Sequence, residues 1–128
     1  MKKLLFLILL FVSASAYAQQ GMELNLWPQG PQTNNGDPND MAKISIFLPK
    51  KSQSTGRAIV ICPGGGYTHL AFEKEGTAWA PFFNSMGIAV IVLKYRMPHC
   101  VWKVPAEDAE EARSEEHTSE LQSPMRIS

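Results

Sequence analysis

Three stretches of the chain have the apolar patterns of β-strands. Residues 41–48 (MAKISIFL) place an apolar side chain at every second position, with Lys43 and Ser45 opposite, which predicts a half-buried strand. Residues 58–62 (AIVIC) and 88–93 (IAVIVL) have no polar face. Runs of this kind are typical of strands that are covered on both sides in a parallel sheet.

The segment between the two fully apolar strands predicts a helix. Residues 77–86 (TAWAPFFNSM) begin with Thr77 as a candidate N-cap, and Pro81 falls in the first turn, where its missing N–H costs least. Gly87 stands where a helix commonly ends in a left-handed residue. Strand, glycine loop, helix, glycine and strand together form the pattern of one right-handed βαβ unit.

The remaining segments predict connections and one further helix. Residues 23–40 are rich in Pro, Gly, Asn and Gln and are expected to form an extended loop, and residues 49–56 a polar turn. Pro105 is expected to open a short helix with acidic residues in its first turns. The pattern therefore predicts an α/β protein with a mostly parallel sheet and flanking helices.

Composition excludes some classes of partner. Twelve basic and twelve acidic residues leave no net charge to attract nucleic acid. No cluster of His, Cys or acids has the spacing of metal ligands, so neither a metal nor a cofactor is expected. Cys62 and Cys100 could pair in an oxidising compartment. We favour unpaired cysteines, with Cys62 as a small buried hydrophobe, because two cysteines alone make no disulfide framework.

Residues 1–18 have the pattern of a secretory signal peptide. Two lysines precede the apolar run 4–12, and Ala16-Tyr17-Ala18 forms a small-residue cleavage site. The apolar run is far shorter than the roughly 20 residues that span a membrane. We therefore expect a bacterial protein that is cleaved after Ala18 and is secreted or periplasmic, with no membrane span after cleavage.

The stretch ICPGGGYTHL, residues 61–70, carries the candidate chemistry. Glycines after a buried strand let backbone N–H groups approach a ligand, either a phosphate or the oxyanion of an acyl-transfer intermediate. A dinucleotide fingerprint would need a third glycine where the chain has His69. The oxyanion interpretation fits better, because the His-Gly-Gly-Gly motif of α/β-hydrolases lies in the same place, with Pro63 here in place of its His. A tight turn that needs glycine for its shape alone remains the alternative.

Several motifs resemble secreted bacterial α/β-hydrolases of the carbohydrate-esterase group, often classed with acetyl xylan esterases. They are LNLWPQG, CPGGGY, FEKEG, NSMGIAVIVLKYR and VPAEDAEEA, in this order across residues 24–112. The resemblance implies the N-terminal portion of an α/β-hydrolase fold. It also implies a serine ester hydrolase that deacylates a polysaccharide such as acetyl xylan, without metal or cofactor. It makes Gly65 and Gly66 the candidate oxyanion donors, with Gly64 and Tyr67 shaping the loop.

Other polar residues are given lesser roles. Tyr95-Arg96 matches a motif of that group, and we expect a structural ion pair between Arg96 and Asp108. Proteins of this group often have a glycine at the position of Cys100.

His69 and His99 are expected to be loop residues without a catalytic role. Glu73 and Glu75 either flank the mouth of the pocket or, as we favour, belong to a solvated face.

The nucleophile of such an enzyme is missing from the sequence. No G-x-S-x-G occurs, and Ser85 lacks the first glycine of that motif. Residues 113–128 (RSEEHTSELQSPMRIS) have no apolar periodicity, and the triplets of a common sequencing-adapter DNA translate to RSEEHTSELQS. We therefore expect residues 19–112 to be the authentic part of a truncated hydrolase domain, followed by an artefactual tail.

The chain as written is accordingly expected to be an inactive fragment of an ester hydrolase. The alternatives are a fragment of an exported peptidase of the same fold and a non-catalytic periplasmic binding protein.

Overall fold

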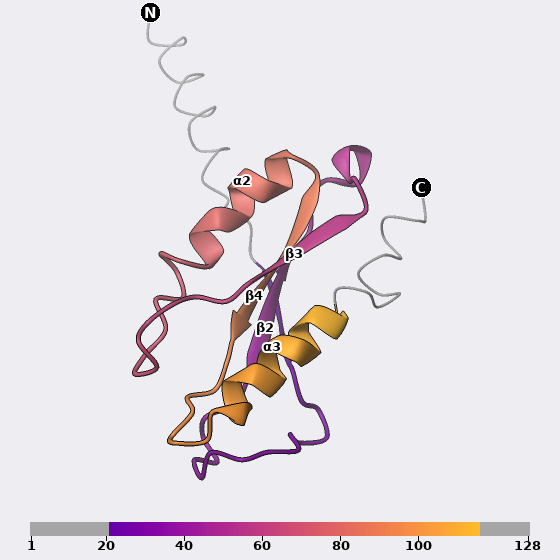
Figure 1. The fold of residues 1–128 in the computed structure, drawn as a ribbon. Coiled ribbons are helices and arrows are strands. Elements are labelled where there is room, and N and C mark those ends of the chain that lie inside the picture. Colours follow the sequence, from indigo (N-terminus) through magenta and orange to yellow (C-terminus); the bar gives the residue numbers. More distant parts are fainter. Residues whose placement is uncertain (1–20, 116–128) are drawn as a thin grey trace, which may run out of the picture.

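The computed structural model describes residues 21–115. Within them, four strands form one sheet in the order β1-β2-β4-β3, and two α-helices pack against it (Figure 1). The predicted signal peptide, residues 1–18, and residues 116–128 lie outside the described range. The strands are β1 (Met22–Asn25), β2 (Lys43–Phe47), β3 (Arg57–Ile61) and β4 (Ile88–Lys94); the helices are α2 (Ala80–Ser85) and α3 (Lys103–Glu115); and the short 3₁₀ turns are η1 (Lys51–Gln53) and η2 (Thr77–Trp79).

The sheet is mixed, so the expectation of a mostly parallel sheet is wrong for this part of the fold. β3 and β4 pair in parallel, whereas β2 is antiparallel to both β1 and β4. Only the connection from β3 to β4 contains a helix, and a crossover of this kind is what returns a chain to the same end of a sheet. The turn with η1 reverses the chain between β2 and β3, and β4 then lies between these two strands.

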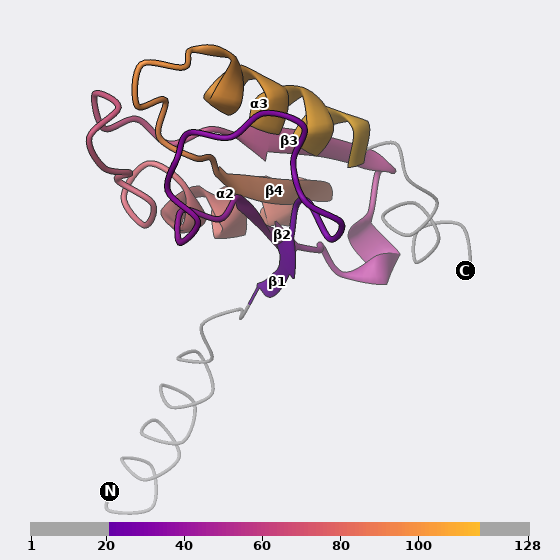
Figure 2. The same cartoon turned by 90° about the horizontal axis from the view of Figure 1, so that it is seen from below.

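Two apolar layers hold the fold together, one on each face of the sheet. Figure 2 shows α3 on one side of the strands and α2 on the other. The layer beneath α3 includes Ile44, Ile91 and Leu93, and the layer beneath α2 includes Phe47 and Val90. The centre of β4 is fully buried, as the fully apolar run predicted.

The strands β1, β2 and β3 differ from the prediction in burial or extent. β2 is covered on both faces, since Ser45 is only 7% exposed, so the half-buried prediction is wrong. β3 is only half-buried because it lies at an edge of the described sheet, with no second strand beside it among residues 21–115. Residues 22–25 form the opposite edge strand and all four of them are exposed, although residues 23–25 were expected to be loop.

The helix ends follow the prediction in part. Thr77 begins η2 and caps nothing; Trp79 is the N-cap residue of α2 and makes no side-chain capping bond. Pro81 lies in the first turn, as predicted, and Gly87 takes a left-handed conformation with φ = +75°. α3 starts two residues before Pro105 and continues through residues 113–115, the first three of the predicted tail. Within residues 21–115, neither helix is long and apolar enough to cross a membrane.

Candidate functional site

The glycine loop, residues 63–67, leaves the carboxyl end of β3. Because β3 and β4 are parallel, both strands end at the same edge of the sheet, where open α/β sheets generally bind ligands. A cavity of about 530 Å³ opens at this edge. Its lining comes from the glycine loop, the end of β4 and the start of α3: Cys62, Pro63, Gly64, Tyr67, Tyr95, Trp102, Pro105, Ala106 and Ala109.

The conformation of the loop requires glycine at its centre. Gly65 has φ = +155°, and a Cβ there would lie 1.7 Å from the carbonyl oxygen of His69. Gly66 has φ = +62°, with open space where a Cβ would stand. Tyr67 also takes a left-handed conformation, with φ = +59°, which few non-glycine residues adopt. The glycine run is thus explained in part by the shape of the turn.

Hydrogen bonds clamp the loop on both sides. The Tyr95 hydroxyl donates to the carbonyl of Pro63 at 2.5 Å, and the Gly64 N–H donates to Oε2 of Glu75 at 2.8 Å. Farther along, the carbonyl of Gly65 accepts from both the N–H and the hydroxyl of Thr68. The loop is therefore held by side chains from β4's end and from the segment before α2.

Within residues 21–115, three backbone donors of the loop have no acceptor, namely the N–H groups of Gly65, Gly66 and Tyr67. The N–H of Gly64 is taken by Glu75. Of the four residues predicted for the site, Gly64 and Tyr67 line the cavity. Gly65 and Gly66 lie in the turn between them and are not part of the lining. A pair of open N–H groups on adjacent residues can receive an anion or a polarised carbonyl oxygen.

Two titratable groups at the cavity keep their protons. The pKa of the Tyr95 hydroxyl is raised, first by burial and then by the nearby Tyr67, Cys62 and Glu75. Tyr95 therefore remains a donor to Pro63 at neutral pH. Burial also raises the pKa of the Cys62 thiol, although part of this residue reaches solvent at the cavity wall.

Both cysteines are free, as we favoured, but Cys62 is exposed, so the prediction of a buried Cys62 is wrong. Cys62 follows the edge strand β3, so it has no neighbouring strand within the described residues to cover it. Within residues 21–115, no three His, Cys, Asp or Glu side chains gather as a metal site would require.

The acids and histidines near the loop take different places. Glu75 is exposed, as expected for a solvated face, and its carboxylate also accepts a hydrogen bond from the N–H of Gly64. It therefore lies beside the glycine loop, close to the position considered for it at the mouth of the pocket. Glu73 is exposed, as expected for a solvated face. His69 and His99 are exposed loop residues, and neither lines the cavity.

The predicted ion pair is confirmed and is fully buried. Nη2 of Arg96 lies 2.8 Å from Oδ1 of Asp108, and the two side chains are 3% and 0% exposed. The same carboxylate accepts from the backbone N–H of Arg96 and from Nε1 of Trp27. Nη1 of Arg96 donates to the carbonyl of Thr33, so this pair fastens the loop of residues 26–40 to β4 and α3.

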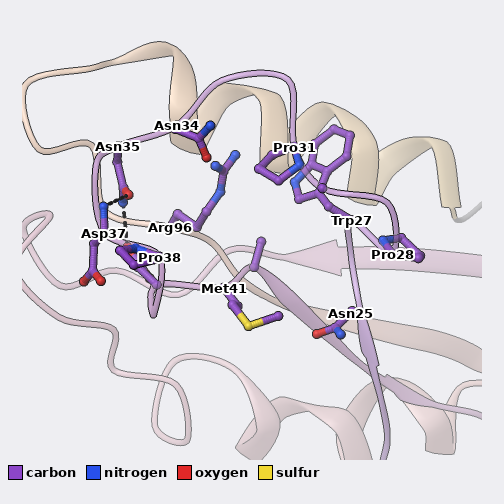
Figure 3. Close-up of a pocket in the computed structure, with 13 residues that line it drawn as sticks. Asn25, Trp27, Pro28, Pro31, Asn34, Asn35, Asp37, Pro38, Met41 and Arg96 are labelled. Atoms are coloured by element: carbon purple, nitrogen blue, oxygen red, sulfur yellow. Dashed lines mark hydrogen bonds between the residues drawn. The ribbon is translucent and has the colours of Figure 1, made fainter.

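A second cavity of about 320 Å³ lies between that loop and Arg96 (Figure 3). The hydrogen-bonding groups of Asn35, a polar residue of its lining, are already paired with neighbouring protein groups. Nδ2 of Asn35 donates to the Asp40 carboxylate and to the carbonyl of Met97, and its Oδ1 accepts from the N–H of Asp37. We therefore attribute this cavity to loop packing and place the candidate site at the glycine loop.

Two residues of the site were not placed there by the sequence analysis: Tyr95, which was named only as part of a structural motif, and Trp102. Tyr95 follows the end of β4, and the parallel pairing of β3 and β4 would have placed it beside Pro63. Trp102 lines the cavity with 72% of its surface exposed, and a lone aromatic residue in a loop gives no periodic pattern that could have indicated this.

The fold and the site define an α/β sheet protein with a glycine-loop cavity at the carboxyl end of a parallel strand pair. No family model matches the chain. The chain is 34% identical over 105 residues to an acetylxylan esterase of Xylanibacter ruminicola, covering 82% of this chain and 19% of that protein. It thus spans about a fifth of the length of this relative.

A solved structure gives a similar result. The crystal structure of an acetyl ester-xyloside bifunctional hydrolase from Caldicellulosiruptor lactoaceticus matches with a TM-score of 0.61 and 28% identity, covering 76% of this chain and 36% of that chain. Both similar proteins are named for hydrolysis of acetyl esters, which supports the resemblance to an esterase group that the sequence motifs indicated.

Proposed function

We propose that this chain is the N-terminal part of an exported serine ester hydrolase that removes acetyl groups from acetylated xylan. The observation that carries the proposal is the glycine loop, which leaves the N–H groups of Gly65 and Gly66 open at the carboxyl end of β3. The similarity to two proteins that act on acetyl esters supplies the class of substrate and favours ester over peptide hydrolysis.

In this proposal the loop acts on the intermediate of acyl transfer. A serine hydroxyl attacks the acetyl carbonyl, a histidine takes the proton, and the carbonyl oxygen becomes an oxyanion. The Gly65 and Gly66 N–H groups donate to that oxygen. The intermediate then expels the sugar oxygen, which takes the proton from the histidine; water releases acetate from the serine in a second cycle. One such donor is typically worth about 10²–10³ in kcat.

These 128 residues contain no G-x-S-x-G motif. They therefore lack the serine nucleophile, and with it the order of serine, acid and histidine that the catalytic triad of this fold requires. We propose that these three residues are encoded beyond Ala112 in the genomic reading frame, and we call the protein encoded by that complete frame the gene product. The 128-residue chain itself should then be inactive.

Hydrolysis of a chromogenic acetyl ester tests the role of the loop in the gene product. Gly66→Ala places a Cβ in open space but at φ = +62°, so the backbone must shift and turn the open N–H away. We expect kcat to fall at least tenfold. Gly56→Ala is the matched control, since Gly56 has φ = +75° and equally open space but lies far along the chain from the loop.

The control should lose a similar amount of stability, about 1 kcal/mol, with kcat unchanged. The 128-residue chain should show no turnover above a heat-inactivated sample. Turnover by that chain, or an undiminished kcat in Gly66→Ala, would contradict the proposal.

A further inference from the structure

Trp102 stands out among the aromatic side chains of the cavity. It is 72% exposed, the highest exposure among the large hydrophobic residues from 21 to 115, and Tyr67 on the glycine loop is 62% exposed. Both line the same cavity. Leaving large aromatic surfaces in water is unfavourable, and such exposure beside a cavity is typical of a binding surface.

The position of Trp102 is fixed by the backbone around it. The N–H of Val101 donates to the carbonyl of Pro98 at 2.7 Å, and the N–H of Val104 donates to the carbonyl of Val101 at 3.1 Å. Trp102 therefore lies inside the second of two consecutive hydrogen-bonded turns, directly before the first residue of α3. A backbone held in this way loses little conformational freedom when a ligand binds.

The surroundings of the ring suit an uncharged ligand with one apolar face. Nζ of Lys103 lies 6.0 Å from the centre of the Trp102 ring, so a cation is already near it. Tyr67 forms an edge-to-face pair with Tyr95, at 6.5 Å between ring centres, and its hydroxyl has no partner within the described residues. The cavity thus combines apolar aromatic surface with a hydroxyl that is open to hydrogen bonding.

A pyranose ring has this combination of properties, with axial C–H groups on a face and hydroxyls around its rim. We propose that Trp102 is a specificity-determining residue that stacks against a sugar ring of the xylan main chain, with the Tyr67 hydroxyl bonding to the rim. The inference rests on the proposed function for the identity of the sugar. Stacking on Trp102 gives the enzyme its preference for an acetylated polysaccharide over a small acetyl ester.

Binding of unacetylated xylotetraose to the gene product tests this without any ester chemistry. Trp102→Ala should raise the Kd about tenfold, the size expected for loss of one aromatic stacking contact. Trp102→Phe, which keeps an aromatic face, should recover most of the affinity. Trp79→Ala is the matched control, because Trp79 is 49% exposed but lies outside the cavity lining. The Kd of this variant for xylotetraose should stay within twofold of that of the unmutated gene product.

A kinetic comparison adds a second readout. In Trp102→Ala, we expect KM to rise by a larger factor for acetylated xylan than for the chromogenic acetyl ester. Equal Kd values in Trp102→Ala and Trp79→Ala, or no detectable binding of xylotetraose, would overturn the inference while leaving ester hydrolysis in place. Xylotetraose binding that depends on Trp102 in a gene product without esterase activity would overturn the proposed function alone.

Discussion

His99 and Cys100 both take left-handed backbone conformations, with φ of +43° and +69°. Side chains with a Cβ are strained there by about 1–2 kcal/mol per residue, whereas glycine is not. Cys100 is exposed and free, so its side chain contributes neither packing nor a disulfide. A glycine at this position, which the resemblance to the carbohydrate-esterase group implies, would relieve this strain in the turn before Trp102.

Replacing Cys100 with glycine should therefore stabilise the gene product. Relief of the left-handed strain exceeds the added entropy of the unfolded chain, which costs about 0.4–1 kcal/mol, and leaves a net gain of about 0.5–1 kcal/mol. Urea unfolding measures this gain as a higher midpoint. Cys100→Ala removes the thiol but keeps the Cβ and should give no gain; equal midpoints for the two variants would refute the explanation.

At the scale of elements, the buried pair between Arg96 and Asp108 joins β4, α3 and the 26–40 loop. The Asp108 carboxylate is fully buried and accepts bonds from Arg96 and Trp27. Thr33 adds a second tie, since its N–H and hydroxyl both donate to the Glu107 carboxylate. The start of α3, which forms one wall of the cavity, is therefore positioned by contacts with the opposite end of the described chain.

Loss of the Asp108 carboxylate should be among the costliest single changes in the fold. Asp108→Ala leaves the guanidinium of Arg96 buried without its counter-charge, which costs about 3–5 kcal/mol. Thermal or urea unfolding of the gene product gives the value. Glu110→Ala on the exposed face of the same helix should change stability by less than about 0.5 kcal/mol. A similar loss in both variants would contradict this role of the buried pair.

The elements that could be predicted are those specified by local patterns. The apolar run of β4, the helix between two strands and the glycine at position 87 each follow from neighbouring residues. β1 could not be predicted in this way, because its four exposed residues are held only by pairing with β2 some twenty positions away.

The sequence also predicted the local features of the site but not the contacts between residues that are distant in the chain. The glycine loop was visible in the sequence, but its clamps were not, since Glu75 and Tyr95 reach Gly64 and Pro63 from distant positions in the chain. The ion pair from Arg96 to Asp108 was predicted because a resemblance, rather than a pattern, had placed both residues in known motifs.

At the scale of the whole molecule, the described sheet has an apolar edge at β3. Ile59 and Ile61 on this strand are only half-buried, and within residues 21–115 no other strand covers the outer side of β3. Unpaired edges of this kind favour association with a further strand. We propose that residues 19–112 are the first part of a larger hydrolase domain and that residues 113–128 are translated adapter. The helical conformation of residues 113–115 continues α3 and is compatible with either origin.

The most direct test of this account is the genomic sequence read from the region that encodes β4 past the codon for Ala112. We predict that the frame continues without RSEEHTSELQS, through a helix and a strand, into G-x-S-x-G, followed by an acid and a histidine. That result would supply the nucleophile for the oxyanion donors proposed at Gly65 and Gly66. A clean genomic read that encodes RSEEHTSELQS and then stops would contradict the account and favour a non-catalytic binding protein.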